Sequence, residues 1–289
     1  MENFHISIIG AGPAGMFCAI QLKKYGYDPV IFEKDKIGGL SREAYFINNI
    51  PGFPNGINGI HFANLLQKHL EKFNIKFINS KIEKVIYENN QFILTTLFGN
   101  YSCNILIVAS GTKPKPSNTK ISEKLKSKVF YSLDNLRDYK AKCIAIIGSG
   151  DIAFDYALSL SNKNKVIILN RSSKPKAIPA LIEEAEKKHN IKLLNETELV
   201  KVEEYRDRLL LTLNNLKEIV VDHILFAIGR EPELDFIDKK IIKKHNVLNM
   251  SGKLYIIGDA KNGIYRQITI AAGGGIRCAM EIHNRLKQT

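Results

Sequence analysis

The chain has 289 residues, of which 45% are hydrophobic and 25% are charged, and it carries a formal net charge of +13. Its length favours two domains over one hydrophobic core, and its composition is that of an ordinary globular protein. No apolar run approaches the roughly 18 residues of a membrane-spanning helix. The first expected strand begins near His5, which leaves no room for a signal peptide. We therefore expect a cytoplasmic protein without a membrane partner.

The excess of positive charge would permit a nucleic acid or an acidic protein as partner. Lysine greatly outnumbers arginine, however, and no basic run contains interleaved aromatic residues. We therefore expect no nucleic acid. An acidic electron-carrier protein remains a partner that this charge would suit.

The four cysteines lie far apart in the sequence, at Cys18, Cys103, Cys143 and Cys278. No two of them have the spacing of a CxxC pair or of zinc ligands, so we expect neither a metal site nor a disulfide framework. We expect all four to behave as small hydrophobic side chains in or near the core.

The sequence alternates short β-branched runs with helical patterns, which is typical of a parallel sheet covered by helices. One part of this pattern occurs twice, as a strand, a glycine-rich turn, a helix and a second strand. These elements are expected at 5–9, 10–15, up to about Tyr25 and 29–32, and again at 143–147, 148–153, up to about Ser161 and 165–169. Each copy is followed by a later strand that ends in a similar turn, at Ser110-Gly111 and at Ile228-Gly229. Two copies of a nucleotide-binding half predict two bound nucleotides.

The domain limits follow from where these copies stop. Residues 113–124 have the Pro-, Ser-, Lys- and Asn-rich composition of a linker. Residues 254–259 predict a buried strand and 268–287 a closing helix, without a glycine motif of their own. We therefore expect an α/β fold of two Rossmann-like, three-layer dinucleotide-binding domains, one inserted into the other. The expected limits are 1–113 and 224–289 for the divided domain, and 114–223 for the inserted domain.

The first glycine motif, Gly10-x-Gly12-x-x-Gly15, lies between a strand and a helix, which is the context that indicates a dinucleotide site. The first glycine permits a tight turn, the second lets the backbone approach a pyrophosphate, and the third lets helix and strand pack closely. The helix N-terminus adds free N–H groups for the diphosphate. Glu33 ends the second strand, where a carboxylate can accept hydrogen bonds from ribose hydroxyls.

The second motif, Gly148-x-Gly150-x-x-Ala153, has the same form. Its second strand is followed by Asn170 and Arg171 instead of an acidic residue. Arg171, with Lys174 and Lys176, can neutralise a 2′-phosphate, which favours NADPH over NADH. A solvated basic loop in a lysine-rich protein is the alternative interpretation.

Further segments carry a resemblance to a known family. They are the two glycine motifs, Glu33, Gly38-Gly39, Asn49-Ile50-Pro51-Gly52-Phe53-Pro54, Gly258-Asp259 and Tyr265-Arg266-Gln267. Together they resemble the thioredoxin-reductase-like flavoproteins over nearly the whole chain. The resemblance implies a homodimer in which 1–113 and 224–289 form the FAD-binding domain and 114–223 form the NAD(P)-binding domain. It also implies that Arg266, Gln267 and Ile268 lie near the isoalloxazine, Asp259 near the ribityl chain and Asn49 near the flavin face.

The motifs and the resemblance together predict a set of cofactor-binding residues, without a catalytic acid, base or nucleophile and without a metal ligand. The set is Gly10, Gly12, Pro13, Ala14, Gly15, Glu33, Lys34, Gly39, Leu40, Asn49, Val85, Ser110, Gly111, Gly148, Gly150, Asp151, Ile152, Arg171, Lys176, Gly229, Gly258, Asp259, Arg266, Gln267 and Ile268.

One departure from the family bears on the reaction. Thioredoxin reductases carry a CxxC just before the second glycine motif, but residues 129–134 of this chain contain no cysteine. Without two thiols there, electrons cannot pass through an internal disulfide to thioredoxin. This segment resembles instead the branch that acts as ferredoxin– or flavodoxin–NADP reductase.

The main hypothesis is therefore an FAD-containing NAD(P)H oxidoreductase. It would transfer hydride from NADPH (or NADH) to the flavin and pass electrons to ferredoxin or flavodoxin. Two alternatives stay open: a disulfide reductase of unusual design that uses one of the four cysteines, for example Cys18, and a flavin-binding redox sensor.

Overall fold

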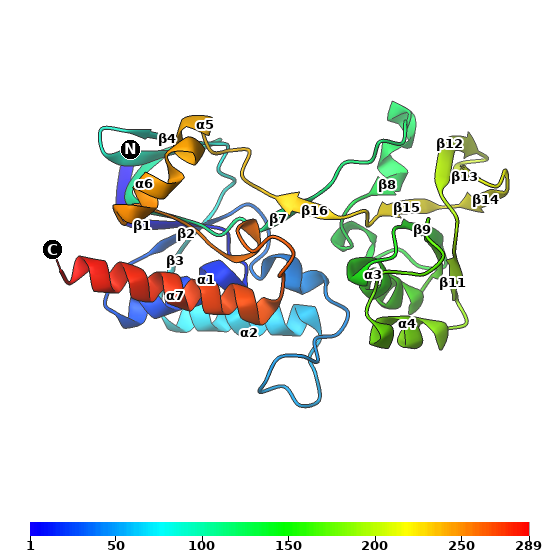
Figure 1. The fold of residues 1–289 in the computed structure, drawn as a ribbon, viewed down its shortest axis with the longest axis horizontal. Helices are drawn as coiled ribbons and strands as arrows, with labels where there is room; N and C mark the ends of the chain where they lie inside the picture. The colour runs from blue at the N-terminus through cyan, green and yellow to red at the C-terminus, as the bar shows by residue number, and fades with distance from the viewer. Residues whose placement is uncertain (289) are drawn as a thin grey trace. The chain divides into compact units, whose positions relative to one another are not determined.

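The structure is a computed structural model that describes residues 1–288, and these residues form two compact units (Figure 1). Unit 1 comprises Met1–Arg42, Ile47–Lys113 and the chain from Glu231 onward. Unit 2 comprises Glu43–Phe46 and Pro114–Arg230. The assignment of FAD to one expected domain and of NAD(P) to the other stays a prediction.

Unit 1 is built on a mixed seven-stranded sheet with the order β3-β2-β1-β6-β5-β4, in which β17 pairs with β6 (Figure 1). Its strands are β1 (Glu2–Ile9), β2 (Val30–Glu33), β3 (Lys76–Asn79), β4 (Lys84–Glu88), β5 (Gln91–Thr96), β6 (Gly99–Val108) and β17 (Leu254–Ile256). The pairs among β3, β2, β1, β6 and β17 are parallel, whereas β5 is antiparallel to both β6 and β4. The turn after β1 therefore lies at the carboxyl edge of parallel strands, where open α/β sheets bind ligands.

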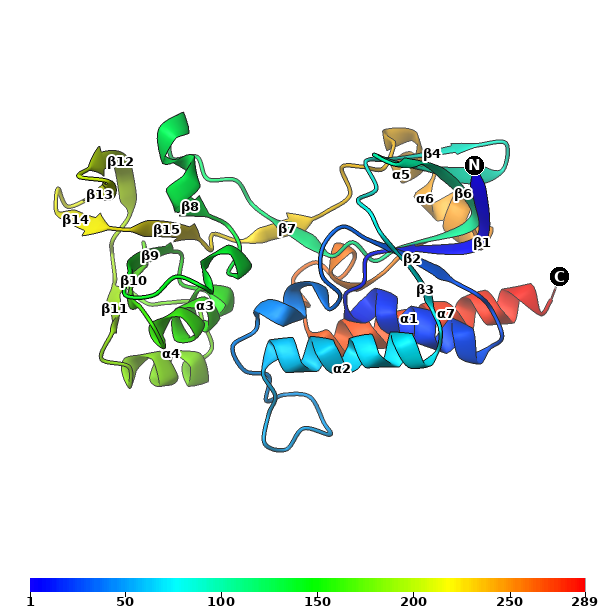
Figure 2. The same cartoon turned by 180° about the vertical axis from the view of Figure 1, so that it is seen from behind.

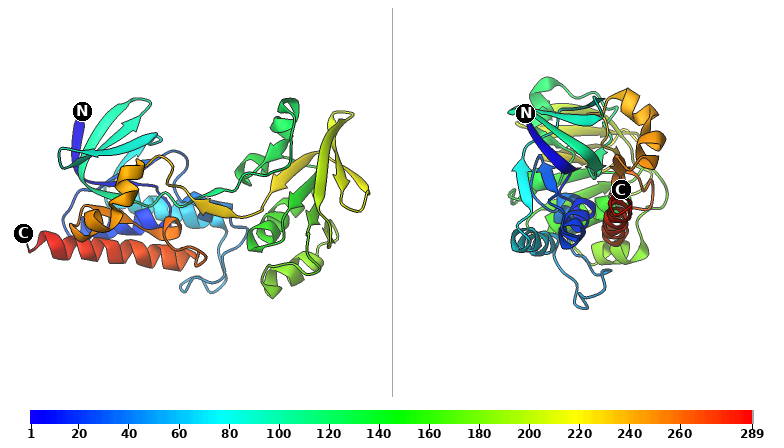
Figure 3. Two further views of the ribbon diagram at one scale, coloured as in Figure 1. Left: turned by 45° about the horizontal axis from the view of Figure 1, so that its top comes forward. Right: turned by 90° about the vertical axis from the view of Figure 1, so that its left-hand side faces the viewer.

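Helices cover both faces of this sheet, which gives unit 1 three layers (Figures 1 and 2). The helical segments of unit 1 are α1 (Pro13–Lys24), α2 (Gly59–Lys72), α5 (Lys239–Lys243), α6 (His245–Met250), α7 (Ile268–Leu286) and the 3₁₀ turns η1 (Gly39–Glu43), whose last residue falls in unit 2, and η4 (Gly258–Ala260). Helices α1 and α7 lie side by side on one face (Figure 3). Their close approach requires Gly275, because a Cβ there would lie 2.2 Å from the carbonyl oxygen of Ala14.

The parallel strands of unit 1 are apolar on both faces because helices cover both faces. Ile6, Ile8 and Ile31 are at most 1% exposed. Ile241 of α5 and Leu248 of α6 complete the core on the face opposite α1. Burial of these side chains stabilises the edge on which the glycine turn lies.

Unit 2 contains a five-stranded sheet with the order β11-β10-β9-β15-β8 and a three-stranded antiparallel sheet with the order β12-β13-β14. The strands are β8 (Val129–Phe130), β9 (Cys143–Ile147), β10 (Lys165–Leu169), β11 (Ile191–Leu194), β12 (Leu199–Tyr205), β13 (Arg208–Leu213), β14 (Glu218–Val221) and β15 (His223–Phe226). Its helical segments are α3 (Asp151–Ser161), α4 (Pro179–Glu186), η2 (Glu123–Lys128) and η3 (Asp134–Leu136). All pairs in the larger sheet are parallel.

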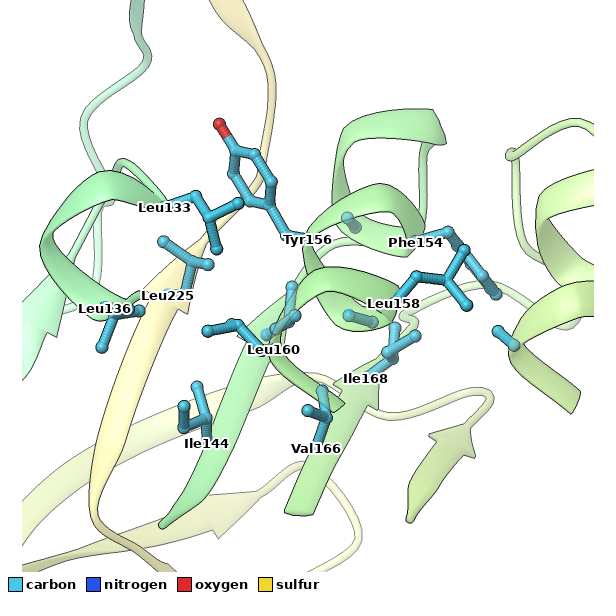
Figure 4. Packing of buried hydrophobic residues seen from close by; sticks show 14 of the residues in the cluster. Leu133, Leu136, Ile144, Phe154, Tyr156, Leu158, Leu160, Val166, Ile168 and Leu225 are labelled. Carbon is cyan, nitrogen blue, oxygen red and sulfur yellow. The ribbon is translucent and has the colours of Figure 1, made fainter. Parts of the chain in front are cut away.

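The core of unit 2 lies between α3 and the parallel sheet (Figure 4). Phe154, Leu158 and Leu160 of α3 belong to one buried cluster with Ile144 of β9 and Ile168 of β10, and each of these side chains is at most 3% exposed. The chain passes from one unit to the other at both ends of Glu43–Phe46, and again within β7 (Thr112–Pro114) and β16 (Arg230–Pro232). Strands β7 and β16 pair as a two-stranded sheet.

Most of the expected elements are confirmed, including the strands at Cys143–Ile147 and Lys165–Leu169 and the end of the helix at Ser161. The expected strand at 254–259 is too long. Its strand ends at Ile256, because Gly258 adopts a φ of +64° and begins the turn η4. Within residues 1–288, no helix is long and apolar enough to span a membrane.

Candidate functional site

The turn between β1 and α1 has no room for side chains at two of its three glycines. A Cβ at Gly10 would lie 2.3 Å from the carbonyl oxygen of Ala109, and one at Gly15 would lie 2.0 Å from that of Gly10. Gly12 differs, because nothing lies within 4 Å of its Cβ position. The chain therefore leaves open space where a dinucleotide motif brings its backbone against a pyrophosphate, at the N-terminus of α1.

Glu33 is joined to this turn by hydrogen bonds. Its Oε2 accepts from the backbone N–H of Ala11 at 2.7 Å, and its Oε1 accepts from that of Asp35 at 2.9 Å. Burial raises the pKa of the Glu33 carboxyl, against the lowering effect of these two bonds. Each carboxylate oxygen keeps a lone pair for a further donor, as a ribose hydroxyl would require.

The loop after β2 returns to the same turn. The backbone N–H of Gly38 donates to the carbonyl of Ala11 at 2.8 Å. A Cβ at Gly39 would lie 3.2 Å from the Cα of Gly12, so the predicted residues Gly39 and Leu40 begin η1 beside the open glycine.

A cavity of about 290 Å³ opens beside Gly10 and Glu33. Its lining includes four residues that the sequence predicted, namely Gly10, Glu33, Lys34 and Ser110. Nine lining residues are outside the predicted set. Ile9 and Phe32 directly precede Gly10 and Glu33, and the other seven are Ser80, Lys81, Ile82, Glu83, Glu233, Asp235 and Phe236. These seven come from two loops that carry no motif, so only the tertiary fold could reveal them.

One side of this cavity is held by the segment after β16. The hydroxyl of Ser110 donates to the carbonyl of Glu233 at 2.6 Å, and the N–H of Glu233 donates to the carbonyl of Gly111 at 3.1 Å. Lys34 forms an ion pair with Glu233. The turn at Ser110-Gly111 therefore fixes the cavity wall.

Val85 lies apart from the other predicted residues, because it belongs to the core of unit 1. Its side chain is fully buried, its N–H donates to the carbonyl of Phe236 at 2.8 Å, and its carbonyl accepts from Asp238 at 3.0 Å. Its neighbours Ile82 and Glu83 line the cavity instead.

A second group of predicted residues in unit 1 comes from the C-terminal part of the chain. The side-chain amide of Asn49 donates to Oε1 of Gln267 at 3.0 Å, so two residues far apart in sequence meet. Gln267 precedes α7, whose first residue is Ile268, and Arg266 is partly buried beside it. Gly258 lies against α1, since a Cβ there would lie 2.7 Å from that of Ala14, and Asp259 follows it in η4.

The second glycine motif repeats the geometry of the first in unit 2. A Cβ at Gly148 would lie 2.4 Å from the carbonyl oxygen of Ala227, whereas nothing lies within 4 Å of the Cβ position of Gly150. Asp151 and Ile152 begin α3. Gly229 adopts a φ of +115° beyond the end of β15.

The loop after β10 folds back onto this motif. The carbonyl of Ser149 accepts from the N–H groups of Lys176 and Ala177 at 2.9 and 3.0 Å. Oδ1 of Asp151 accepts from Ile178 at 2.9 Å. Arg171 and Lys176 therefore lie on a loop that is hydrogen-bonded to the second glycine turn. Both side chains are exposed, and no ion pair of the described residues involves either of them.

Unit 2 contains a polar cluster that sequence reasoning missed, in the segment where the resemblance would place a CxxC. Oε1 of Glu43 accepts from the hydroxyl of Ser132 at 2.5 Å, and Oε2 accepts from the hydroxyl of Tyr156. The N–H of Tyr45 donates to Oδ2 of Asp155 at 2.9 Å. Burial raises the pKa of Asp155 to about 6 and that of Tyr156 well above its ordinary value.

The cysteines lie in or near the core, as expected, and all four are free thiols. Cys18, Cys103 and Cys278 are buried, and Cys143 is partly buried. Burial raises the pKa of Cys103 to about 12, while a hydrogen bond to Cys18 and burial raise the pKa of Cys278. The part of the chain that the structure describes contains no cluster of His, Cys, Asp and Glu that could hold a metal ion.

Comparisons with known proteins agree with this arrangement. A protein-family model described as pyridine nucleotide-disulphide oxidoreductase matches residues 4–275. A ferredoxin–NADP reductase of Pelagibacter ubique is 31% identical over 279 residues, which cover 87% of this chain and 82% of that protein. A thioredoxin reductase of Borreliella burgdorferi is 27% identical, and the match covers 98% of this chain and 92% of that protein.

The fold also matches solved structures. The thioredoxin reductase of Lactococcus lactis superimposes with a TM-score of 0.86 at 20% identity, and the match covers 99% of this chain and 100% of that one. This likeness confirms the expected α/β fold.

Proposed function

The chain belongs to the pyridine nucleotide-disulphide oxidoreductase family, and we propose that it passes electrons from NADPH through FAD to a carrier protein such as ferredoxin or flavodoxin. The observation that carries the proposal is that each unit has a glycine turn with open space at the Cβ position of its middle glycine, Gly12 or Gly150, in a chain with no CxxC. Two such turns suit two dinucleotides, and the missing thiol pair suits an acceptor other than an internal disulfide.

In this proposal unit 1 holds FAD. The N-terminus of α1 and Gly12 would hold the pyrophosphate, and Glu33 would accept hydrogen bonds from a ribose. Asn49 and Gln267 would position the flavin ring as a joined pair. The remaining unit 1 residues of the predicted set stay proposals in the same role.

Unit 2 would hold the nicotinamide nucleotide. Gly150 and the N-terminus of α3 would approach its pyrophosphate, and Arg171 and Lys176 would neutralise a 2′-phosphate. When bound, the two cofactors supply the hydride chemistry, and the protein positions and tunes them. No side chain needs to act as acid, base or nucleophile.

A carrier protein suits this chain better than a small disulfide. The net charge of +13 would attract an acidic partner. The raised pKa of Cys103 and Cys278 leaves little of the reactive thiolate near neutral pH. A homodimer and a cytoplasmic location are parts of the same proposal, and light scattering of the purified protein tests the first.

The test is an anaerobic stopped-flow experiment in which the flavin-loaded protein is mixed with NADPH or with NADH while the flavin absorption band is followed. We expect fast bleaching by NADPH, and then reoxidation by an added ferredoxin or flavodoxin. Slow bleaching by both nucleotides would contradict the proposal and favour a flavin-binding redox sensor. Fast bleaching with reoxidation by a low-molecular-weight disulfide alone, lost in a cysteine-free variant, would favour a disulfide reductase.

A further inference from the structure

Asn170, the residue directly after β10, is an unusual polar residue because it is buried and fully hydrogen-bonded. It is 1% exposed. Its Oδ1 accepts from the hydroxyl of Ser149 at 2.7 Å and from the N–H of Ser172 at 3.1 Å. Its Nδ2 donates to the carbonyl of Ser172 and to Oδ1 of Asn195, both at 2.8 Å. The side-chain amide thus makes four hydrogen bonds, which is its usual capacity.

The backbone of Asn170 is held as firmly as its side chain. Its N–H donates to the carbonyl of Leu194 at 2.9 Å, and its carbonyl accepts from the N–H of Thr197 at 2.8 Å. A side chain whose donors and acceptors are all engaged within the protein has none left for a ribose. Asn170 therefore does not act here as the carboxylate does at this position in NAD-binding sites.

The bonds of Asn170 connect two parts of the second nucleotide site. Ser149 is the middle residue of the Gly148-Ser149-Gly150 turn, and Ser172 directly follows Arg171. Both the N–H and the carbonyl of Ser172 are bound by the same amide group, which closes a tight turn around Arg171. The backbone carbonyl of Ser149 in turn accepts a hydrogen bond from the backbone N–H of Lys176, at the far end of this loop.

We propose that Asn170 is a positioning residue for nucleotide preference: by closing the turn around Arg171 and joining it to Ser149, it holds the basic loop ready for a 2′-phosphate. This inference rests on the proposed function, since it concerns the nicotinamide nucleotide of unit 2. Asn170 acts through Arg171 and touches no phosphate itself. An organised cationic loop binds a phosphate more tightly than a mobile one, because less conformational entropy is lost on binding.

The decisive substitution is Asn170→Asp. A carboxylate has no N–H, so two oxygen acceptors, on Ser172 and Asn195, would face a negative oxygen. The turn should open, and the freed carboxylate could accept bonds from an unphosphorylated ribose. We expect Kd for NADP⁺ to rise at least about tenfold, while Kd for NAD⁺ stays within about threefold or falls.

The matched control is Asn195→Asp, which adds the same charge directly beside Asn170, in the loop after β11. It keeps the acceptor oxygen that Asn170 needs, so we expect Kd for both nucleotides to change less than about threefold. A general electrostatic effect of an added carboxylate would instead raise Kd for NADP⁺ in both variants. This control therefore separates positioning from charge.

A second comparison asks whether Asn170 acts through Arg171. In an Arg171→Ala background the loop has no guanidinium to position, so adding Asn170→Asp should raise Kd for NADP⁺ by less than about threefold. Ser149→Ala removes one of the four bonds and adds no charge. Ser149→Ala should raise Kd for NADP⁺ by about threefold, and this variant keeps the proposal testable if Asn170→Asp does not fold.

The measurement is isothermal titration of the flavin-loaded protein with NADP⁺ and with NAD⁺, which reads binding without turnover. An equal rise in Kd for both nucleotides in Asn170→Asp or Ser149→Ala would overturn the inference, because loss of a merely structural residue would weaken the binding of both nucleotides alike. An unchanged ratio of the two Kd values would also overturn it. If the wild-type protein binds neither nucleotide, the proposed function itself fails, which is a distinguishable result.

Discussion

The backbone N–H of Ala11 donates a 2.7 Å hydrogen bond to Oε2 of Glu33, so the first glycine turn and the end of β2 form one hydrogen-bonded structure. The other carboxylate oxygen of Glu33 accepts from Asp35 at 2.9 Å, which fixes the start of the next loop. The same side chain lines the cavity of unit 1. Glu33 therefore shapes the proposed FAD site before any ligand is bound.

Glu33→Gln should weaken FAD binding by about ten- to hundredfold. The amide group offers one acceptor oxygen instead of two, so one of the two backbone N–H groups is left facing an NH₂ group. Kd is measured by titrating FAD into the flavin-free protein. Glu83→Gln is the control, because Glu83 lines the same cavity but pairs with Lys81 at its exposed rim. Equal FAD affinity of wild type and Glu33→Gln would contradict this role.

The open glycines give two separable predictions. Gly12 and Gly150 have φ values of −76° and −85°, which alanine adopts, and their Cβ positions meet no protein atom within 4 Å. Alanine at either position should therefore change the free energy of unfolding of the ligand-free protein by less than about 1 kcal/mol. Its methyl group would instead occupy ligand space.

We accordingly expect Gly12→Ala to lose FAD affinity while NADP⁺ still binds, and Gly150→Ala to lose NADP⁺ affinity while FAD stays bound. Titration calorimetry with each ligand measures both. Gly10→Ala is the contrasting variant, because a Cβ there would lie 2.3 Å from the carbonyl oxygen of Ala109 at a φ of +107°. It should destabilise the ligand-free protein by several kcal/mol, on the order of a severe core mutation. Loss of both ligands in Gly12→Ala would refute the assignment of one nucleotide to each unit.

The sequence could predict the parts of the site that depend on local order. A strand, a glycine turn and a helix follow one another directly at Gly10 and at Gly148. A residue at the end of the next parallel strand lies at the same edge of the sheet as the glycine turn, and this order predicts Glu33 and Arg171 as site residues. Asn49 and Gln267 were linked only through the family resemblance, since 218 positions separate them.

The parts that the sequence did not reveal depend on tertiary contacts. Glu233 reaches the cavity wall only because Ser110 and Gly111 bind its backbone, and neither contact has a sequence signal. The same holds for Glu43, which meets Ser132 and Tyr156 in unit 2. The antiparallel strand β13 is different, because it does have a sequence signal: Leu209, Leu211 and Leu213 recur with the period of two that predicts a strand, and these are its buried side chains.

The thiols should differ in reactivity toward a thiol reagent at pH 8. Cys143 is partly buried, whereas the other three cysteines are buried, so we expect one fast-reacting thiol in the folded protein. Unfolding in guanidinium should expose all four. Cys143→Ser should abolish the fast phase and leave electron transfer to a carrier protein unchanged. A loss of that activity would favour the disulfide-reductase alternative.

Asp155 should make unit 2 less stable as the pH rises through the acidic range. Burial raises its pKa from 3.8 to about 6 in the folded protein. Between these two values the folded state binds more protons than the unfolded state, so the free energy of unfolding falls as the pH rises from about 4 to above 6. The loss is about 2 kcal/mol, after allowance for partial solvent access.

Asp155→Asn should remove this loss, because its amide is uncharged and its Oδ1 can still accept from the N–H of Tyr45. We expect the variant to match wild type near pH 4 and to be more stable by about 2 kcal/mol at pH 7.5 in urea unfolding. Asp138→Asn, at an exposed position of the same unit, is the control and should be neutral at both pH values. If Asp155→Asn is less stable than wild type at pH 7.5, the ionised carboxylate contributes to stability there, and the buried site must supply enough donors to offset its desolvation.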